Sequence, residues 1–203
     1  AGAIGGGVVN KTIGAAGRMA SETINTENML LEQGYKVGLH ADYSEKGYRQ
    51  RQDISEGIQE GMFKPDSQFY KTFRGQVGGL SELSQINREV IQFGMDNKLF
   101  QTDDKATSTA DFTKQIVSQN DRLREAFGEV GKVLNTNFSE TANFFKQMTD
   151  MGVSSIDQFK ERAKDLKVLA KASKTGVEEI MQFHASLAGM AQQTGFSPGN
   201  AAM

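Results

Sequence analysis

The residues of this sequence that could do acid–base or metal chemistry are few and widely spaced. Glu178 and Glu179 are an adjacent acidic pair, but neighbours on a helix do not face each other, so they cannot work as a facing acid and base. In a first helical turn they would stabilise the N-terminal dipole. His40 and His184 are the two histidines, there is no cysteine, and a zinc site needs three or four ligands. We therefore predict no enzyme, no catalytic residue, no cofactor and no metal ligand.

A glycine-rich segment near the start has the composition of a phosphate-binding loop over residues 5–12. Such a loop needs a glycine directly before its Lys-Thr pair and a strand before the loop. Asn10 stands at the glycine position, so nucleotide binding is not predicted. Residues 1–17 hold six of the 22 glycines and are interpreted as a flexible or closely packed segment. A membrane-active segment is the alternative, although the apolar run is shorter than the roughly 20 residues that span a bilayer.

The elements that would position any site are helices, and one apolar seam dominates them. Its six residues are spaced 4-3-4-3-4, which is typical of one side of a helix: Ile116, Asn120, Leu123, Phe127, Val130 and Leu134. Apolar residues continue the pattern beyond Leu134, so we expect one long helix from about Ala110 to Met151. This helix cannot bury its stripe alone and needs a neighbour from this chain or from a copy of it. We predict that the seam is an assembly surface. Asn120 would set the register and copy number there.

The remaining segments also predict helices. Helical spacing recurs over residues 18–100, and the polar residues 101–109 have the composition of a linker. We place the main subdivision at this linker, before the long helix and a hairpin at residues 110–203. With two prolines in 203 residues, the chain is predicted to be all-α, with long amphipathic helices in an elongated bundle or a coiled-coil-like assembly.

A short repeat follows the long helix. Residues 152–159 recur 24 residues later as 176–183, with Gly, Val, Ile, Gln and Phe matching. Each copy is expected to begin a helix in the same way, after a glycine that closes the previous helix, with a capping box at Ser155 and at Thr175. The prediction is an αα-hairpin that packs on the long helix through Phe159 and Phe183.

Charge gives little indication of a nucleic-acid partner. The formal net charge is −2, and residues 106–203 hold eleven Lys or Arg and eleven Asp or Glu. A basic footprint is absent from these totals, so no sequence-specific nucleic-acid binding is predicted. The chain opens on Ala1 and closes shortly after Ser197-Pro198, which is a helix-starting pair. We therefore expect it to be a fragment of a longer protein.

The second half of the chain resembles a known family. Three features of the chain carry the resemblance: its long Gln-, Lys- and Phe-rich helices, the Gly/Ala-rich start, and residues 169–180, which run Leu-Ala-Lys-Ala-Ser-Lys-Thr-Gly-Val-Glu-Glu-Ile. Together they resemble tail tape-measure and internal DNA-ejection proteins of tailed bacteriophages. The resemblance implies a structural virion protein in the tail or capsid interior that assists genome delivery. Its partners would be copies of itself, other virion proteins and the host envelope on infection. The alternatives are a secreted bacterial helical translocator or effector and a helical adaptor module.

Overall fold

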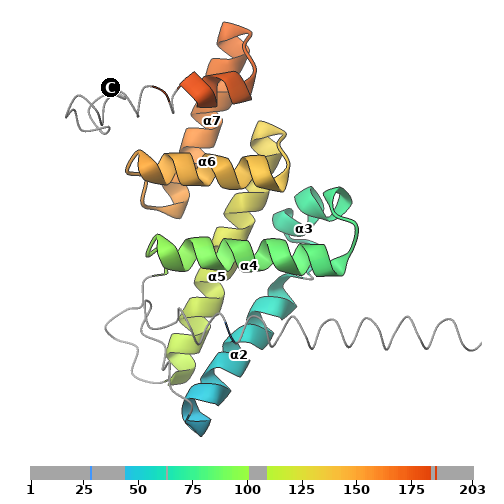
Figure 1. Cartoon of the computed structure of the whole chain (residues 1–203), viewed down its shortest axis with the longest axis vertical. Helices are drawn as coiled ribbons and strands as arrows, with labels where there is room; N and C mark the ends of the chain where they lie inside the picture. The colour runs from blue at the N-terminus through green and yellow to red at the C-terminus, as the bar shows by residue number, and fades with distance from the viewer. Residues whose placement is uncertain (1–27, 29–43, 63, 101–108, 184–185, 187–203) are drawn as a thin grey trace, which may run out of the picture. The chain divides into compact units, whose positions relative to one another are not determined.

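The computed structural model describes residues 28, 44–62, 64–100, 109–183 and 186. These residues form helices and turns, with no strand among them, so the predicted all-α class is confirmed (Figure 1). The helices are α2 (Glu45–Met62), α3 (Gln68–Phe73), the 3-10 turn η2 (Arg74–Gln76), α4 (Leu80–Asp96), α5 (Thr109–Leu134), α6 (Phe138–Asp150) and α7 (Ile156–Ser173). Residues 177–183 are also helical.

The chain divides into two compact units that are interleaved in sequence. Unit 1 comprises Ala1–Lys64 and Val77–Asp121, and unit 2 comprises Pro65–Gln76 and Arg122–Met203. Helix α5 therefore contributes its first half to unit 1 and its second half to unit 2. This division does not coincide with the expected one at 101–109, most of which lies outside the described residues, as does the 1–17 segment.

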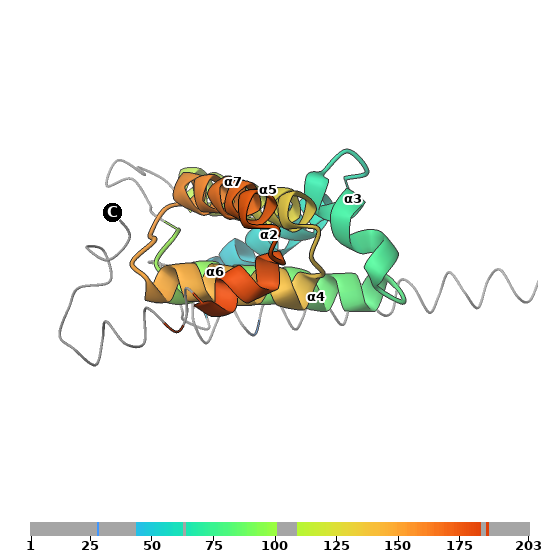
Figure 2. The ribbon, with the colours of Figure 1, turned by 90° about the horizontal axis from the view of Figure 1, so that it is seen from above.

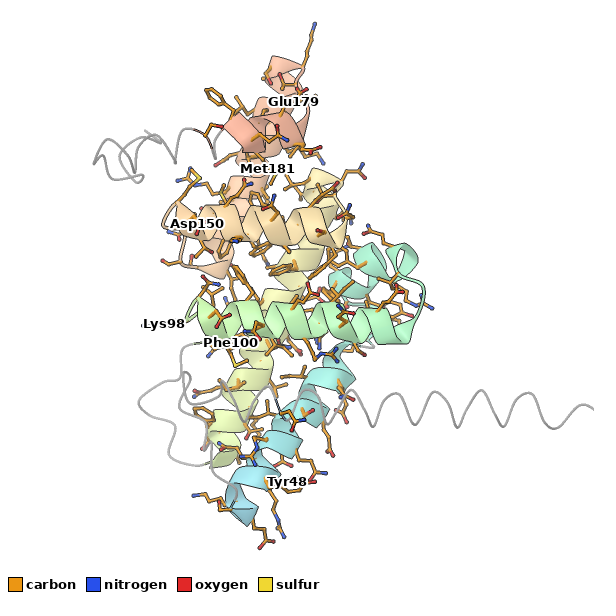
Figure 3. The ribbon with its side chains drawn as sticks, viewed as in Figure 1. Tyr48, Lys98, Phe100, Asp150, Glu179 and Met181 are labelled. Atoms are coloured by element: carbon orange, nitrogen blue, oxygen red, sulfur yellow. The ribbon has the colours of Figure 1, made fainter. Side chains whose placement is uncertain are left out.

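The core of unit 1 comes from α2, α4 and the first half of α5. Its buried apolar residues are Ile54, Ile58, Leu83, Val90, Ile91, Met95, Leu99, Phe100 and Ile116. The helices approach closely at Gly57 of α2, where a Cβ would lie 2.9 Å from Cγ2 of Val117 on α5. Helix α4 ends at Asp96, Lys98 beyond it takes a left-handed conformation at φ 53°, and Phe100 is buried at 5% exposure (Figure 3).

The core of unit 2 is aromatic. Helix α7 lies beside α5, and α6 occupies a second layer (Figure 2). Phe127 of α5 stacks on Phe145 of α6 with ring centroids 3.9 Å apart, and Phe145 meets Phe159 of α7 at 4.5 Å. Phe73 of α3 meets the ring of Phe138 edge-on at 5.5 Å. Burial of each large side chain is worth roughly 1.5–3 kcal/mol, so these rings hold α3, α5, α6 and α7 together.

The long helix expected from Ala110 to Met151 is wrong, because the chain breaks between Leu134 and Phe138. Asn135 takes a left-handed conformation at φ 57°, and the N–H of Thr136 donates to the carbonyl of Gly131 at 3.0 Å. These are the features of a Schellman C-cap. Asn137 then starts α6 with a full capping box to Glu140. The apolar spacing continues across the break, because Leu134 and Phe138 are both buried.

The two copies of the repeat do not begin their helices in the same way, which corrects the expectation. Gly152 closes α6 at φ 88°, but the residue that closes α7 is Lys174, at φ 56°. Gly176 instead offers the first carbonyl of the next helix, which accepts the N–H of Ile180 at 3.2 Å. Ser155 accepts from the N–H of Gln158 at 3.3 Å, whereas the Thr175 hydroxyl donates back to the carbonyl of Ser173 at 3.3 Å.

Candidate functional site

The predicted seam is buried by the chain itself. Ile116 and Asn120 lie in unit 1 and the other four residues in unit 2. The exposed fractions of Ile116, Asn120, Leu123, Phe127, Val130 and Leu134 do not exceed 5%. We expected another chain to cover the seam. This expectation is corrected, because the helices of this chain already bury its six side chains.

The two matched aromatics of the repeat have different environments. Phe159 is fully buried against Phe145, as expected of a residue that holds α7 on the preceding helix. Phe183 is 61% exposed, so its expected burial is wrong. The different starts of the two helices explain this result, because a different N-cap changes which residues of the repeat face the core. In the same segment the inner positions are Ile180 and Met181, each 6% exposed, and Glu179 is exposed (Figure 3).

The polar contacts of unit 2 hold the short helix α3 on α5. The carboxylate of Glu125 accepts the N–H of Gln68 at 2.7 Å, which places an acceptor at the positive end of α3. The Thr72 hydroxyl donates to the carbonyl of Gly128 at 3.0 Å. Ser67 caps α3 by accepting from the N–H of Tyr70 at 3.0 Å. The described carboxylate and hydroxyl groups of this region thus serve capping and docking.

Asn120 is the most unusual buried polar residue. Its side chain is 0% exposed, and neither Nδ2 nor Oδ1 has a hydrogen-bond partner among the described residues. A buried amide left without partners costs roughly 1–3 kcal/mol. Asn87 of α4, in the same unit, is 3% exposed with its Oδ1 also unpartnered. Nearby in sequence, burial lowers the pKa of Arg88 below its ordinary value, and the charge of Glu89 partly opposes this shift.

The described residues hold no group of three or more His, Cys, Asp or Glu side chains that could bind a metal ion. Both histidines, His40 and His184, lie outside the described residues, as does the glycine-rich segment 5–12. Glu178 and Glu179 are exposed. Among the described helices, none has the length and apolarity that crossing a membrane requires.

A shallow depression of ≈ 370 Å³ lies between the turn after α6 and the first turns of α7. It is lined by Met151, Gly152, Val153, Gln158, Glu161, Arg162 and Asp165. All of these residues are exposed or half-buried. Its charged groups therefore remain hydrated, and the depression does not have the enclosed, desolvated lining that is typical of a small-molecule site.

The outer face of α7 carries a row of lysines that the charge totals did not reveal. The lysine row consists of Lys160, Lys164, Lys167, Lys171 and Lys174, spaced 4-3-4-3. The first four lie on one side of α7, and Lys174 is the C-cap residue that follows the helix. Lys160 is half-buried and pairs with Glu129 of α5 at 3.0 Å, while the other four are exposed. Testing lysine for helical periodicity, as was done for apolar residues, would have found this row.

Helix α2 carries a row of the opposite sign. The acidic row consists of Asp53, Glu56 and Glu60, spaced 3-4 and all exposed. Residues 53–62 contain no Lys or Arg. Glu56 accepts a hydrogen bond from Nε2 of Gln52 at 3.0 Å. The lysine row and the acidic row are thus two charged surfaces of opposite sign on the described helices.

Comparison with known proteins gives no relative: no family model, no curated protein and no solved structure matches this chain.

Proposed function

We propose that this chain is a structural, non-enzymatic helical component of a tailed-bacteriophage virion, of the tape-measure or DNA-ejection type. It would occupy the tail or capsid interior together with further copies and other virion proteins. The proposal combines the family resemblance of residues 169–180 with the packing of the described helices. Contact with the host envelope would follow during infection.

The observation that best supports a structural role is that polar side chains of unit 2 cap its helices and hold them together. Glu125 receives the first N–H of α3, and the side chains of Asn137 and Glu140 cap α6 reciprocally. Around them the rings of Phe127, Phe145 and Phe159 form a continuous aromatic core. Side chains committed to caps and packing give rigidity, which suits a building element of an assembly.

Fractionation of a culture that produces the phage tests the location. Density-gradient-purified particles, the particle-free medium and the host envelope are probed with an antibody raised against this chain. We expect the signal to band with the particles. A signal in the particle-free medium of cells that make no particles would contradict the virion role and favour secretion. A zymogram of the purified chain on peptidoglycan serves as the enzymatic control, with no clearing expected.

One observation favours the alternative of a secreted translocator, effector or adaptor. Three large apolar side chains of unit 2 are exposed, namely Val168 at 68%, Leu169 at 46% and Phe183 at 61%. Exposed apolar side chains can contribute to a binding surface for another protein. The same fractionation separates this alternative from the virion role.

A further inference from the structure

We propose that the lysine row of α7 on one copy docks against the acidic row of α2 on a second copy of this chain. This inference deepens the proposed function, on which it rests for the expectation that copies assemble. The contact joins two different surfaces, so copies can repeat it head-to-tail as a ring or an open filament, or make it twice in a reciprocal two-fold dimer.

The spacing of the two rows matches. Asp53, Glu56 and Glu60 follow one another at intervals of three and four, as do Lys164, Lys167 and Lys171. At 1.5 Å per residue both sets extend over about 10 Å along their helices. Two helices laid side by side can therefore bring three carboxylates opposite three ammonium groups, because the charges recur at the same distances.

The local charge of each helix supports this pairing. Residues 156–174 contain six Lys or Arg and three Asp or Glu, which gives 6 − 3 = +3, although the whole chain has a net charge of −2. Residues 53–62 contain three carboxylates and no basic residue, which gives −3. Opposite potentials on two surfaces of one chain steer copies into head-to-tail encounters.

The position of the acidic row is unfavourable within α2 itself. Glu60 lies in the last turn of α2, and this turn holds no basic residue. Carboxylates near a helix C-terminus are opposed by the helix dipole, by roughly 0.3–1 kcal/mol each at exposed sites. Lysines from another copy would compensate the charge of Glu60, which no basic residue in the last turn of α2 does.

An exposed apolar side chain borders the lysine row. Val168 lies four residues after Lys164 and three before Lys171, and it is 68% exposed. The aliphatic stems of Lys164 and Lys171, on one side of Val168, can pack on a neighbouring helix while their ammonium groups reach outward. A contact of this kind combines charge pairing with some apolar burial, as protein interfaces commonly do.

Charge reversal on the whole 203-residue chain tests the proposal. One variant carries Asp53→Lys and Glu60→Lys, a second carries Lys164→Glu and Lys171→Glu, and a control carries Lys114→Glu and Lys146→Glu at exposed positions of α5 and α6. Association is measured by sedimentation velocity over a range of concentrations at low and physiological salt. Circular dichroism melts establish that each variant is folded.

The first two variants are expected to associate at least about tenfold more weakly than the wild type, because attraction becomes repulsion. The wild type should itself associate more weakly as salt rises. An equimolar mixture of the two variants should recover association, since one now has two basic surfaces and the other two acidic surfaces. The control should behave as the wild type does.

Three results would overturn the proposal. None of them can be confused with a failure of the virion role, because the fractionation experiment tests that role separately. A wild type that stays monomeric throughout would show that the rows do not join copies. Association that both variants retain would place the contact elsewhere on the chain. If the Lys164→Glu, Lys171→Glu variant alone loses association and also loses retention of a DNA fragment that the wild type binds, the lysine row serves nucleic acid.

Discussion

The backbone of Phe69 lies directly against Gly128, so that a Cβ at residue 128 would come within 2.5 Å of the Phe69 Cα. Helix α3 is separated from α5 by more than thirty residues of chain, yet glycine at this one position lets the two backbones touch. The Glu125–Gln68 and Thr72–Gly128 hydrogen bonds form on either side of this contact. Gly128 therefore determines how α3 is held in unit 2.

Gly128→Ala should destabilise the chain by at least about 2 kcal/mol, because the methyl group meets backbone atoms that cannot rotate away. The measurement is urea unfolding followed by circular dichroism. Gly75→Ala is the matched control, since a Cβ there has nothing within 4 Å, and its change should stay within about 0.5 kcal/mol. Equal, small effects of both substitutions would mean that α3 does not rest on α5.

Phe159→Ala should lower the free energy of unfolding by about 3–5 kcal/mol, because it removes a fully buried ring from the aromatic core. Phe183→Ala should change it by no more than about 0.5 kcal/mol, since Phe183 is 61% exposed. Thermal or urea unfolding of the two variants checks this difference. A large loss on replacing Phe183 would show that its ring is buried in solution.

Asn120→Leu should raise the free energy of unfolding by about 1–3 kcal/mol, because two unpartnered polar atoms are replaced by apolar ones of similar size. Asn143→Leu, at an exposed position of α6, is the control and should be nearly neutral. Because the seam is covered by its own chain, oligomer size by sedimentation should not respond to Asn120→Leu. Destabilisation would show that the Asn120 amide is hydrogen-bonded.

The break between α5 and α6 gives a prediction with a definite sign. In the left-handed conformation of Asn135 an alanine is unfavourable by roughly 1 kcal/mol, whereas glycine is not. Asn135→Ala should therefore destabilise the chain, and Asn135→Gly should be neutral or stabilising. A continuous helix through residue 135 would give the opposite order, because alanine is the better helix former. Urea midpoints of the two variants decide between them.

The sequence was sufficient for the helix class, and for much of the burial, because apolar periodicity is a local property. It placed Leu123, Phe127 and Val130 on one face, and all three are buried. It missed the turn at Asn135. Leu134 and Phe138 are four residues apart and both buried, which is the pattern of a continuous helix, although here a Schellman turn separates them. The Asn137-x-x-Glu140 capping box was the available signal.

Other features depend on long-range contacts that no local pattern contains. Residues 65–76 belong with 122–203 and not with their neighbours in sequence, which follows from the fit of Phe69 and Phe73 against Gly128 and Gly131. The 24-residue repeat led to the wrong prediction that both copies begin their helices in the same way, because sequence similarity does not determine backbone conformation. Five matching residues did not fix the conformation of the two glycines, and only Gly152 has positive φ among the described residues of the repeat.

The proposal that the chain is a structural part of a virion, present in several copies, is tested most directly by counting it in purified particles. Isotope-labelled peptides from α5 and α7 are added to gradient-purified virions, and their mass-spectrometric signals are compared with those of a tail protein of known copy number. We predict a fixed number of copies per particle, greater than one. A chain absent from the particles, or present at far below one copy in each, would contradict the proposal.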